Sequence, residues 1–362
     1  MKTLVFATIS ISKVAGGVEK NIVLLANFFS NKSKVILITL DNDHANSFFK
    51  LSKNVIWLKV GNSKPHEKIS FIQRVLQIFK IRKILFGQEN LTLVCFHHGI
   101  LIRFYLASLG IKKRIICSER NSLSFYKHIK ANRFSLNFFL LTFVDQVTVQ
   151  FKSYIKQYPI WIRPKIIEIN NPVSPQNECV KINLPDTKKR FNILCVGRLC
   201  EQKNQKLLIE AFAHISNQFP DWDLYILGEG PLYKSLLDLI KKLKLESRIF
   251  LRKPVKNIRK YYLKSHIFSM PSLWEGFPNA LAEAMSFGIP AIGLKSCDGV
   301  NNLISHNKTG FLCTTEDFEN ALKIMIQSTQ LRKKLGANSI EMIRKFNEYD
   351  VLKKWEALLI ND

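Results

Sequence analysis

Two cations close together in this 362-residue chain suggest an anion-binding site. Arg198 follows an apolar run that ends at Val196, and Lys203 lies where the next helix is expected to begin. A helix N-terminus carries partial positive charge, so a cation there is disfavoured by up to about 1 kcal/mol. A bound anion such as a diphosphate would remove that penalty. The alternative is a solvated pair of charges neutralised by Glu201.

Two carboxylates eight residues apart flank the start of a second predicted helix. Glu275 lies in the loop after an apolar run, Pro278 suits the first helical turn, and Glu283 lies one turn further on. A carboxylate at the edge of an apolar helix face needs hydrogen-bond donors, which ligand hydroxyls or a structural arginine can supply. The backbone N–H groups near Asn279–Leu281 could hold an anion or a hydroxyl.

The N-terminal half offers weaker candidates. Gly16 and Gly17 separate the first apolar run from the first predicted helix, where backbone N–H groups can approach an anion. The alternative is a tight turn that needs glycine for its dihedral angles. His97 and His98 follow the run Leu91–Phe96 and are candidates for orienting an acceptor molecule, with a structural role as the alternative.

Short apolar runs and helical segments alternate along the chain, which predicts the elements that position these residues. Such alternation indicates an α/β fold with parallel sheets covered on both faces. Predicted helices include Val18–Phe29 and Asn204–Phe219. The predicted strands are Thr3–Ser10, Val35–Leu40, Leu91–Phe96, Arg114–Cys117, Gln146–Val149, Ile166–Ile169, Phe191–Val196, Leu224–Leu227, Arg248–Leu251, Ile267–Met270 and Pro290–Leu294.

The pattern predicts two doubly wound, Rossmann-like domains that face each other across a cleft. Residues 1–175 would form the first domain and residues 188–346 the second, with a C-terminal helix at about 347–362 packing back on the first. The proline-containing segment Asn171–Arg190 is the best candidate for the linker.

Composition narrows the class of protein. Hydrophobic residues make up 47% of the chain and charged residues 23%, which is typical of globular proteins. The seven scattered cysteines contain no Cys-x-x-Cys pair, which favours reduced thiols in a cytosolic protein over zinc ligands or disulfides. No apolar run approaches the roughly 20 residues that a membrane-spanning helix needs. The apolar start is expected to be a strand rather than an export signal.

The net charge of +26 is unevenly distributed. Residues 1–180 hold 26 Lys and Arg against 9 Asp and Glu, a net charge of +17, and residues 181–362 hold 28 against 19, a net charge of +9. This surplus implies an anionic partner, such as nucleic acid, an anionic membrane or a phosphorylated substrate. The basic residues are spread along the chain and form no recognised nucleic-acid motif, which argues against nucleic acid.

Two segments of the first half, Lys68–Phe86 and Lys127–Phe143, interleave cations with apolar residues. A basic amphipathic helix can lie among lipid headgroups, gaining about 1 kcal/mol per cation near an anionic surface. The alternative is an ordinary surface helix whose apolar stripe packs on the sheet. The charge of this half favours contact with an anionic membrane surface.

Together these motifs resemble those of a known family. The chain is similar to the retaining GT-B glycosyltransferases of family 4, including those that build bacterial surface polysaccharides. The resemblance covers almost the whole C-terminal half but only two short blocks, Gly16–Lys20 and Ser118–Asn121, of the N-terminal half. The motifs of the C-terminal half are Arg198-x4-Lys203, Leu227-Gly228-Glu229-Gly230-Pro231, Glu275-x7-Glu283, Gly288-Ile289-Pro290 and Asn307–Leu312.

The resemblance implies transfer of a hexose or N-acetylhexosamine from a nucleotide sugar, and we expect the nucleotide to be UDP. The acceptor would be a lipid-linked sugar or glycan in the synthesis of O-antigen or capsule. Arg198, Lys203 and Glu275 would be catalytic, with the two cations on the donor diphosphate and Glu283 on the ribose. The full implied donor site comprises Gly16, Gly17, Arg198, Lys203, Gly228, Glu275, Gly276, Phe277, Pro278, Asn279, Ala280, Leu281 and Glu283. The acceptor-side candidates are His97, His98, Glu119, Arg120 and Asn121.

The same resemblance implies a metal-independent reaction without other cofactors, in a cytoplasmic enzyme bound peripherally to the inner face of the membrane. The leaving phosphate would take the acceptor's proton, so no side-chain base is assigned. Asp221-Trp222-Asp223 precedes its predicted strand and Asp41-Asn42-Asp43 lies in the acceptor half, so neither predicts a metal site. Two residues depart from the family pattern: Arg252 stands where many members have glycine, and Arg120 where many have histidine.

Three other functions fit part of this pattern. A nucleotide-sugar epimerase on the same scaffold would bind a nucleotide sugar without an acceptor. A nucleic-acid-binding protein would explain only the charge and predicts strongly salt-dependent binding. A catalytically idle homologue would keep the fold alone, although the presence of every charged donor-site position argues against it.

Overall fold

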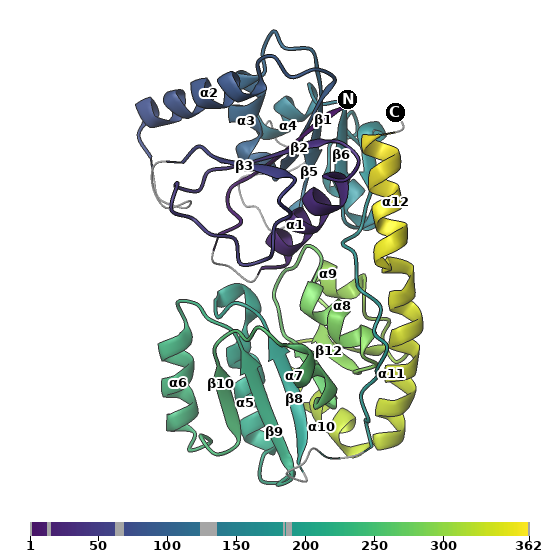
Figure 1. The fold of residues 1–362 in the computed structure, drawn as a ribbon. Helices are drawn as coiled ribbons and strands as arrows, with labels where there is room; N and C mark the ends of the chain where they lie inside the picture. The colour runs from purple at the N-terminus through teal and green to yellow at the C-terminus, as the bar shows by residue number, and fades with distance from the viewer. Residues whose placement is uncertain are drawn as a thin grey trace. The chain divides into compact units, whose positions relative to one another are not determined.

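The computed structural model describes residues 2–12, 16–61, 69–123, 136–183, 185 and 190–360. It divides into two compact units (Figure 1). The N-terminal unit comprises Met1–Asn171 together with Val351–Asp362, and the C-terminal unit comprises Pro172–Asp350.

The N-terminal unit contains a seven-stranded sheet in the order β3-β2-β1-β4-β5-β6-β7, with every neighbouring pair parallel. Its strands are β1 (Thr3–Thr8), β2 (Lys34–Thr39), β3 (Val55–Lys59), β4 (Leu91–Phe96), β5 (Lys113–Ser118), β6 (Gln146–Val149) and β7 (Ile166–Glu168). Its helices are α1 (Gly17–Phe29), α2 (Phe71–Leu85), α3 (His98–Ala107), α4 (Leu136–Leu141), the 3₁₀ helices η2 (Lys152–Gln157) and η3 (Arg163–Lys165), and most of α12 (Glu348–Leu359).

The core of this unit lies between the sheet and the helices α1 and α12. All six residues of β1 are buried, as expected for a central strand covered on both faces. Helix α1 buries Ile22, Ala26 and Phe29, which recur at helical spacing on one face. Trp355 of α12 belongs to the same apolar cluster and lies 6.3 Å from the ring of Phe96. The last helix therefore completes the core of the first unit.

The C-terminal unit contains a six-stranded parallel sheet in the order β10-β9-β8-β11-β12-β13. Its strands are β8 (Phe191–Val196), β9 (Trp222–Leu227), β10 (Ile249–Arg252), β11 (Ile267–Met270), β12 (Ala291–Leu294) and β13 (Gly310–Cys313). Its helices are η4 (Glu201–Lys203), α5 (Gln205–Ile215), α6 (Tyr233–Lys242), α7 (Arg259–Leu263), α8 (Asn279–Ser286), α9 (Asp298–Asn301), α10 (Phe318–Gln327), α11 (Thr329–Ile343) and η5 (Arg344–Phe346).

Both sheets match the predicted α/β class, with differences in detail. The sequence analysis does not predict two of the strands. Strand β3 lies at the sheet edge, where Ile56 is 44% exposed, and β13 begins at Gly310 within the motif Asn307–Leu312. Helix α5 ends at Ile215, one turn before the predicted Phe219. Asp223 lies inside β9 rather than before it. Of the two basic segments, only residues 69–86 and 136–143 fall within the described residues.

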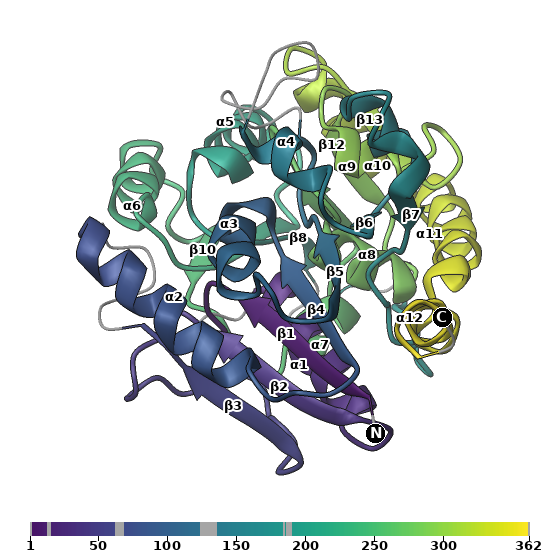
Figure 2. The same ribbon diagram turned by 90° about the horizontal axis from the view of Figure 1, so that it is seen from above.

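The order of each sheet reverses beside its central strand, and this locates the ligand-binding edge. In the N-terminal unit the reversal lies between β1 and β4 (Figure 2), and in the C-terminal unit it lies between β8 and β11. Doubly wound sheets bind ligands at the carboxyl ends of the strands at this point. The loops that follow these four strands carry most of the candidate residues.

All seven cysteines are free thiols. Across the described part of the chain, every helix is too short or too polar to cross a lipid bilayer.

Candidate functional site

In the C-terminal unit, the loops after the two central strands meet through an ion pair. Lys203 follows β8, Glu275 follows β11, and the Lys203 Nζ atom contacts the Glu275 carboxylate. The Lys203 side chain is 19% exposed and that of Glu275 7% exposed. The pair thus lies at the reversal point of this sheet, partly shielded from water. The predicted alternative partner of the cations, Glu201, is exposed and is not the one that pairs with Lys203.

Lys203 does not begin the next helix, which corrects the sequence prediction. It ends the 3₁₀ turn η4, and Asn204 then adopts a left-handed conformation with φ 47° before α5 begins at Gln205. This extra turn directs Lys203 toward the loop after β11. Arg198 is exposed at the start of the same loop, and its carbonyl accepts a hydrogen bond of 3.0 Å from the Gln205 side chain.

Hydrogen bonds to backbone carbonyls hold this loop in place. Leu273 N–H donates to the Gln202 carbonyl at 2.8 Å, and the Gln202 side chain donates to the Trp274 carbonyl at 2.8 Å. Gly228 lies so close beneath the loop that a Cβ atom there would come within 1.9 Å of the Gly197 carbonyl oxygen. Gly228, predicted as a donor-site residue, therefore supports the loop that carries Arg198.

Glu283 of α8 has a partner that the sequence analysis did not find. The Tyr262 hydroxyl donates to the Glu283 carboxylate at 3.0 Å and also approaches the Ala280 carbonyl at 3.3 Å. Burial, and then the nearby carboxylate, raise the pKa of Tyr262 well above its ordinary value, so this hydroxyl keeps its proton and donates. No motif marks Tyr262, because it lies on the separate helix α7, 21 residues before Glu283.

The segment between the two carboxylates forms the start of α8. Gly276, Phe277 and Pro278 are buried, and α8 begins at Asn279 without a side-chain cap. Leu281 is fully buried, so only its backbone can reach a ligand. The segment is packed against α9, because a Cβ atom on Gly299 would lie 2.6 Å from the carbonyl oxygens of Glu275 and Gly276.

In the N-terminal unit, Gly16 and Gly17 lie at the start of α1, as predicted. Lys20 N–H donates to the Gly16 carbonyl at 3.0 Å, which forms the first helical turn. The Glu19 carboxylate folds over this terminus, so that a Cβ atom on Gly16 would lie 2.0 Å from it. A carboxylate is favourable at this positive end. An anionic ligand there would have to displace Glu19.

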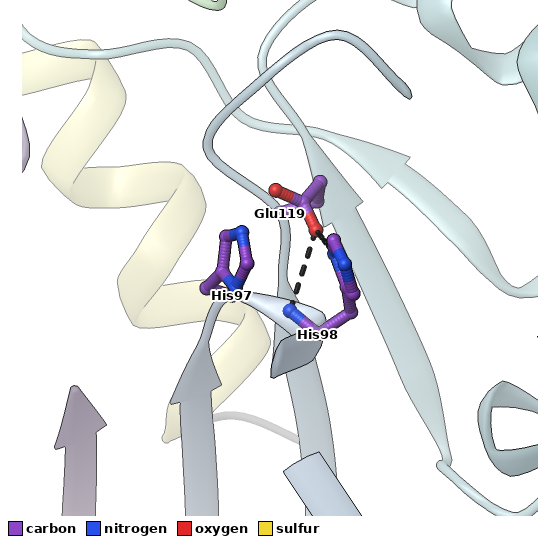
Figure 3. Close-up of side chains that lie close together, drawn as sticks. All are labelled: His97, His98 and Glu119. Atoms are coloured by element: carbon purple, nitrogen blue, oxygen red, sulfur yellow. Dashed lines mark hydrogen bonds and ion pairs between the residues drawn. The ribbon is translucent and has the colours of Figure 1, made fainter. Parts of the chain in front are cut away.

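The two histidines after β4 and Glu119 after β5 form a cluster (Figure 3). The Glu119 carboxylate accepts hydrogen bonds from the His98 backbone N–H at 3.3 Å and from its Nδ1 at 2.5 Å. Its other oxygen accepts from the backbone N–H groups of Arg120 and Asn121 at 3.0 and 3.3 Å. Glu119 thereby ties together the ends of two neighbouring strands.

Arg120 is directed inward. Its guanidinium lies 5.0 Å from the ring of Phe96 and 5.6 Å from that of Trp355, and its Nη1 donates to Asn171 at 3.0 Å. The residue is only 4% exposed. The structure therefore separates Arg120 from the half-buried Asn121 and gives it contacts with α12 instead.

The two Asp-x-Asp triplets are engaged in structural contacts. Asp41 is fully buried and accepts hydrogen bonds from the side chains of Ser10 and Ser12 at 2.5 and 2.7 Å. Asp223 pairs with Arg190 and Arg248. Among the described residues, His97, His98 and Glu119 are the group whose ligand atoms lie close enough to hold a metal ion. However, the Nδ1 atoms of both histidines already form hydrogen bonds.

Comparison with known proteins identifies the family. The model of the family described as glycosyl transferases group 1 matches residues 178–342. A Campylobacter jejuni enzyme named N-acetylgalactosamine-N,N'-diacetylbacillosaminyl-diphospho-undecaprenol 4-alpha-N-acetylgalactosaminyltransferase is 30% identical over 345 residues, 88% of this chain and 89% of the relative. This chain belongs to the group 1 glycosyl transferases.

Further similarities agree with this membership. An Escherichia coli protein named UDP-Gal:alpha-D-GlcNAc-diphosphoundecaprenol alpha-1,3-galactosyltransferase is 33% identical over 179 residues, 46% of this chain and 45% of the relative. Among solved structures, TarM of S. aureus, in a complex that includes UDP, is similar in fold with a TM-score of 0.80. The two chains are 13% identical, and the match covers 99% of this chain and 100% of TarM. The chain is thus a glycosyltransferase with the GT-B fold.

Proposed function

We propose that this glycosyltransferase moves a hexose or N-acetylhexosamine from a UDP-linked sugar to a lipid-diphosphate-linked acceptor, with retention of anomeric configuration. The Lys203–Glu275 pair carries the proposal, because it lies where a doubly wound sheet binds its ligand. The Escherichia coli relative is named for a UDP-linked donor, and both relatives are named for diphospho-undecaprenol-linked sugars, which supports these substrate classes.

The chemistry proposed for this site is stabilisation of a leaving diphosphate. When the bond between the sugar's anomeric carbon and the phosphate oxygen breaks, negative charge develops on the diphosphate. Lys203 and Arg198, together with the N-terminus of α8, place positive charge at that position before the reaction. The paired Glu275 holds the Lys203 ammonium and lies in the loop that leads into α8, near the proposed position of the donor sugar.

Glu283 suits the ribose of the nucleotide. A carboxylate accepts hydrogen bonds from two neighbouring hydroxyls, and the Tyr262 hydroxyl holds this carboxylate in place from the buried side. In the proposed reaction the acceptor oxygen forms the new bond to the anomeric carbon, and its proton passes to the leaving phosphate oxygen. The side chains named supply charge and orientation, and we propose that no metal ion takes part.

Ligand-dependent thermal stability tests the donor site. UDP should raise the apparent melting temperature of the wild type, because a ligand that binds only the folded state stabilises it. In Lys203→Ala this ligand-induced shift should disappear. Lys206→Ala is the matched control, because Lys206 lies three residues away in an exposed pair with Glu210 and should leave the shift unchanged. A full UDP-induced shift in Lys203→Ala would contradict the diphosphate role.

We also propose that the enzyme works peripherally on the cytoplasmic face of an anionic membrane, where a lipid-linked acceptor would be presented. Helix α2 lies on the outside of the N-terminal unit, next to α3 (Figure 2). It buries Gln77, Ile81 and Leu85, whereas Phe71, Ile72, Leu76 and Phe79 are 50–79% exposed. The apolar stripe therefore faces outward, which favours the membrane over the alternative of packing on the sheet.

The spacing of this outward face suits an anionic lipid surface. Ile72, Leu76 and Phe79 recur at helical spacing, and the exposed Lys83 continues the same row four residues later. Exposed Lys80 lies beside that row. Apolar side chains can enter the headgroup boundary while the lysines remain at the level of the phosphates.

Vesicle binding tests the membrane proposal. The double variant Lys80→Gln/Lys83→Gln should bind anionic phosphatidylglycerol vesicles roughly thirtyfold more weakly, since each cation contributes about 1 kcal/mol. Phe79→Ser should weaken binding as well. Ile324→Ser is the control, because Ile324 is 40% exposed on α10 of the other unit and should have no effect. Equal binding of all variants would contradict the proposal.

A further inference from the structure

The turn after β4 has a backbone geometry that few residues adopt. His97 has φ 107° and ψ 134°, a strained combination for a residue with a side chain. Its backbone N–H donates to the Ser118 carbonyl at 2.9 Å, so the end of β5 holds the turn in place. Strain of this kind persists where the surrounding structure imposes it, often at sites that bind ligands.

Gly99 determines how the His97 imidazole is protonated. The Gly99 backbone N–H donates to His97 Nδ1 at 2.9 Å. Since a backbone N–H can only donate, Nδ1 must carry the lone pair, and the proton of the neutral ring lies on Nε2. A Cβ atom on Gly99 would lie 2.8 Å from Nδ1, so a larger residue would displace the ring.

His98 and Glu119 form the rigid support behind His97. The two imidazole rings stack with their centroids 4.2 Å apart and an interplanar angle of 29°. His98 is 5% exposed and Glu119 3% exposed. Burial alone would raise the pKa of Glu119, but the two imidazoles and the hydrogen bonds lower it to about 2. Ionised Glu119 can only accept, so His98 donates through Nδ1–H and its ring orientation is fixed.

We propose that His97 contacts the acceptor sugar, donating a hydrogen bond from Nε2–H to one of its oxygens, with Gly99, His98 and Glu119 as positioning residues. This inference rests on the proposed function. His97 lies at the carboxyl end of β4, at the reversal point of the N-terminal sheet, where a ligand of this unit is expected. Because its Nδ1 lone pair is engaged by Gly99, neutral His97 acts as a hydrogen-bond donor and not as a general base.

Nitrogen NMR of the imidazole rings in the full-length protein tests the positioning without any substrate. The wild type should show His97 with an unprotonated Nδ1 and a protonated Nε2. In Gly99→Ala this signature should be lost, because the added Cβ atom displaces the His97 ring from the Gly99 N–H. A protonated Nδ1 in the wild type, or an unchanged spectrum in Gly99→Ala, would overturn the assignment.

Kinetics test the contact with the acceptor. The probes are UDP-galactose as donor and undecaprenyl-diphosphate-linked N-acetylglucosamine in detergent micelles as acceptor. In His97→Ala the acceptor KM should rise about tenfold, the effect of removing one neutral hydrogen bond. Slow hydrolysis of the donor without acceptor should be unchanged. His97→Gln should recover most of the loss, because its amide N–H can donate but cannot act as a base.

His44→Gln is the matched control, because His44 is an exposed histidine of the same unit and its replacement should change neither constant. A change in donor KM, or equal losses in His97→Gln and His97→Ala, would overturn the proposal. A wild type that turns over neither probe would count against the proposed function at these substrates. The NMR result would still decide whether His97 is positioned as we propose.

Discussion

The two units share one architecture but differ in what they place at its functional edge. Each has a parallel sheet whose order reverses beside a central strand. At that point the C-terminal unit carries a lysine–glutamate pair, whereas the N-terminal unit carries two stacked histidines held by a buried glutamate. The first arrangement suits a charged diphosphate, and the second suits neutral sugar oxygens. In the proposed function, the same topology therefore carries two kinds of recognition through different loop residues.

Their surfaces differ as well. Of the large apolar side chains that are exposed in the described residues, thirteen belong to the N-terminal unit and three to the C-terminal unit. The first half of the chain also carries nearly twice the net positive charge of the second, +17 against +9. A unit that combines exposed apolar groups with excess positive charge suits an amphiphilic anionic partner. This difference supports our proposal that a lipid-linked acceptor binds the N-terminal unit and a water-soluble donor the other.

The largest expected effect comes from breaking the charged pair of the C-terminal unit. Lys203→Met should lower kcat/KM by about 10²–10³-fold, because a preorganised charge at the leaving group is removed. It should also lower the free energy of unfolding by about 1–3 kcal/mol, because buried Glu275 loses its partner. Steady-state kinetics and urea unfolding measure the two effects separately.

The double variant Lys203→Met/Glu275→Gln separates structure from catalysis. It leaves no unpaired charge, so the free energy of unfolding should return close to the wild-type value. Turnover should stay low, because the cation is still missing. Recovery of turnover in the double variant would show that Lys203 only neutralises Glu275, and the assignment of the donor site would fail.

The sequence predicts the fold better than it predicts the contacts within the candidate site. Buried parallel strands such as β4 and β11 are continuous apolar runs, and their predicted bounds, Leu91–Phe96 and Ile267–Met270, match the structure. Edge strand β3 was missed because its side chains are only partly buried, so its pattern resembles a loop. Periodicity detects burial, and strands at a sheet edge bury less.

Within the site, short-range motifs revealed candidate residues but not their partners. The sequence motifs identify both Lys203 and Glu275 as candidates, but the two residues are 72 positions apart in the chain. They pair because β8 and β11 are neighbours in the sheet, which the motifs do not reveal. The partnership of Tyr262 with Glu283 likewise joins two separate elements, α7 and α8, 21 residues apart in the chain. Gly99 gave no signal, because its importance lies in the approach of one imidazole nitrogen.

Acid unfolding should sharpen the contrast by measuring how much the histidine cluster stabilises the N-terminal unit. The pKa of Glu119 is lowered from 4.5 to about 2 in the folded protein. A depressed carboxyl pKa stabilises the folded state above the unfolded-state pKa, and this stabilisation is lost as the pH falls from about 5 toward 2. Above about pH 5 the ionised Glu119 should therefore stabilise the folded protein through the hydrogen bonds that its carboxylate accepts.

Glu119→Gln should remove this contribution. Its free energy of unfolding should be well below that of the wild type at pH 7, and the difference should shrink steadily as the pH falls toward 3. Glu178→Gln is the control, because Glu178 forms an exposed pair with Arg259 in the other unit and should change little at any pH. A difference between Glu119→Gln and the wild type that does not vary with pH would contradict the role assigned to the carboxylate.

The smallest expected effects compare two buried arginines, one in each unit, that both lie against two aromatic rings. Arg332 donates to the carbonyls of Met325 and Ile326 at 2.8 and 2.6 Å and to Thr329 at 2.8 Å. Among the described residues, the Arg120 guanidinium donates to Asn171, and its buried Nε and Nη2 atoms have no hydrogen-bond partner there.

Methionine at each position retains apolar volume and removes the charge, so the comparison isolates the hydrogen bonds. Arg332→Met should cost about 2 kcal/mol, because it leaves carbonyl groups at the end of α10 without donors. Arg120→Met should change the free energy of unfolding by less than about 1 kcal/mol, because the desolvation penalty of its unpaired N–H groups disappears together with its single hydrogen bond. Urea unfolding of both variants measures which substitution lowers the free energy of unfolding more. A larger loss of stability in Arg120→Met than in Arg332→Met would contradict this prediction. It would mean that the contacts of the Arg120 guanidinium with Phe96 and Trp355 stabilise the protein more than the hydrogen bonds of Arg332 do.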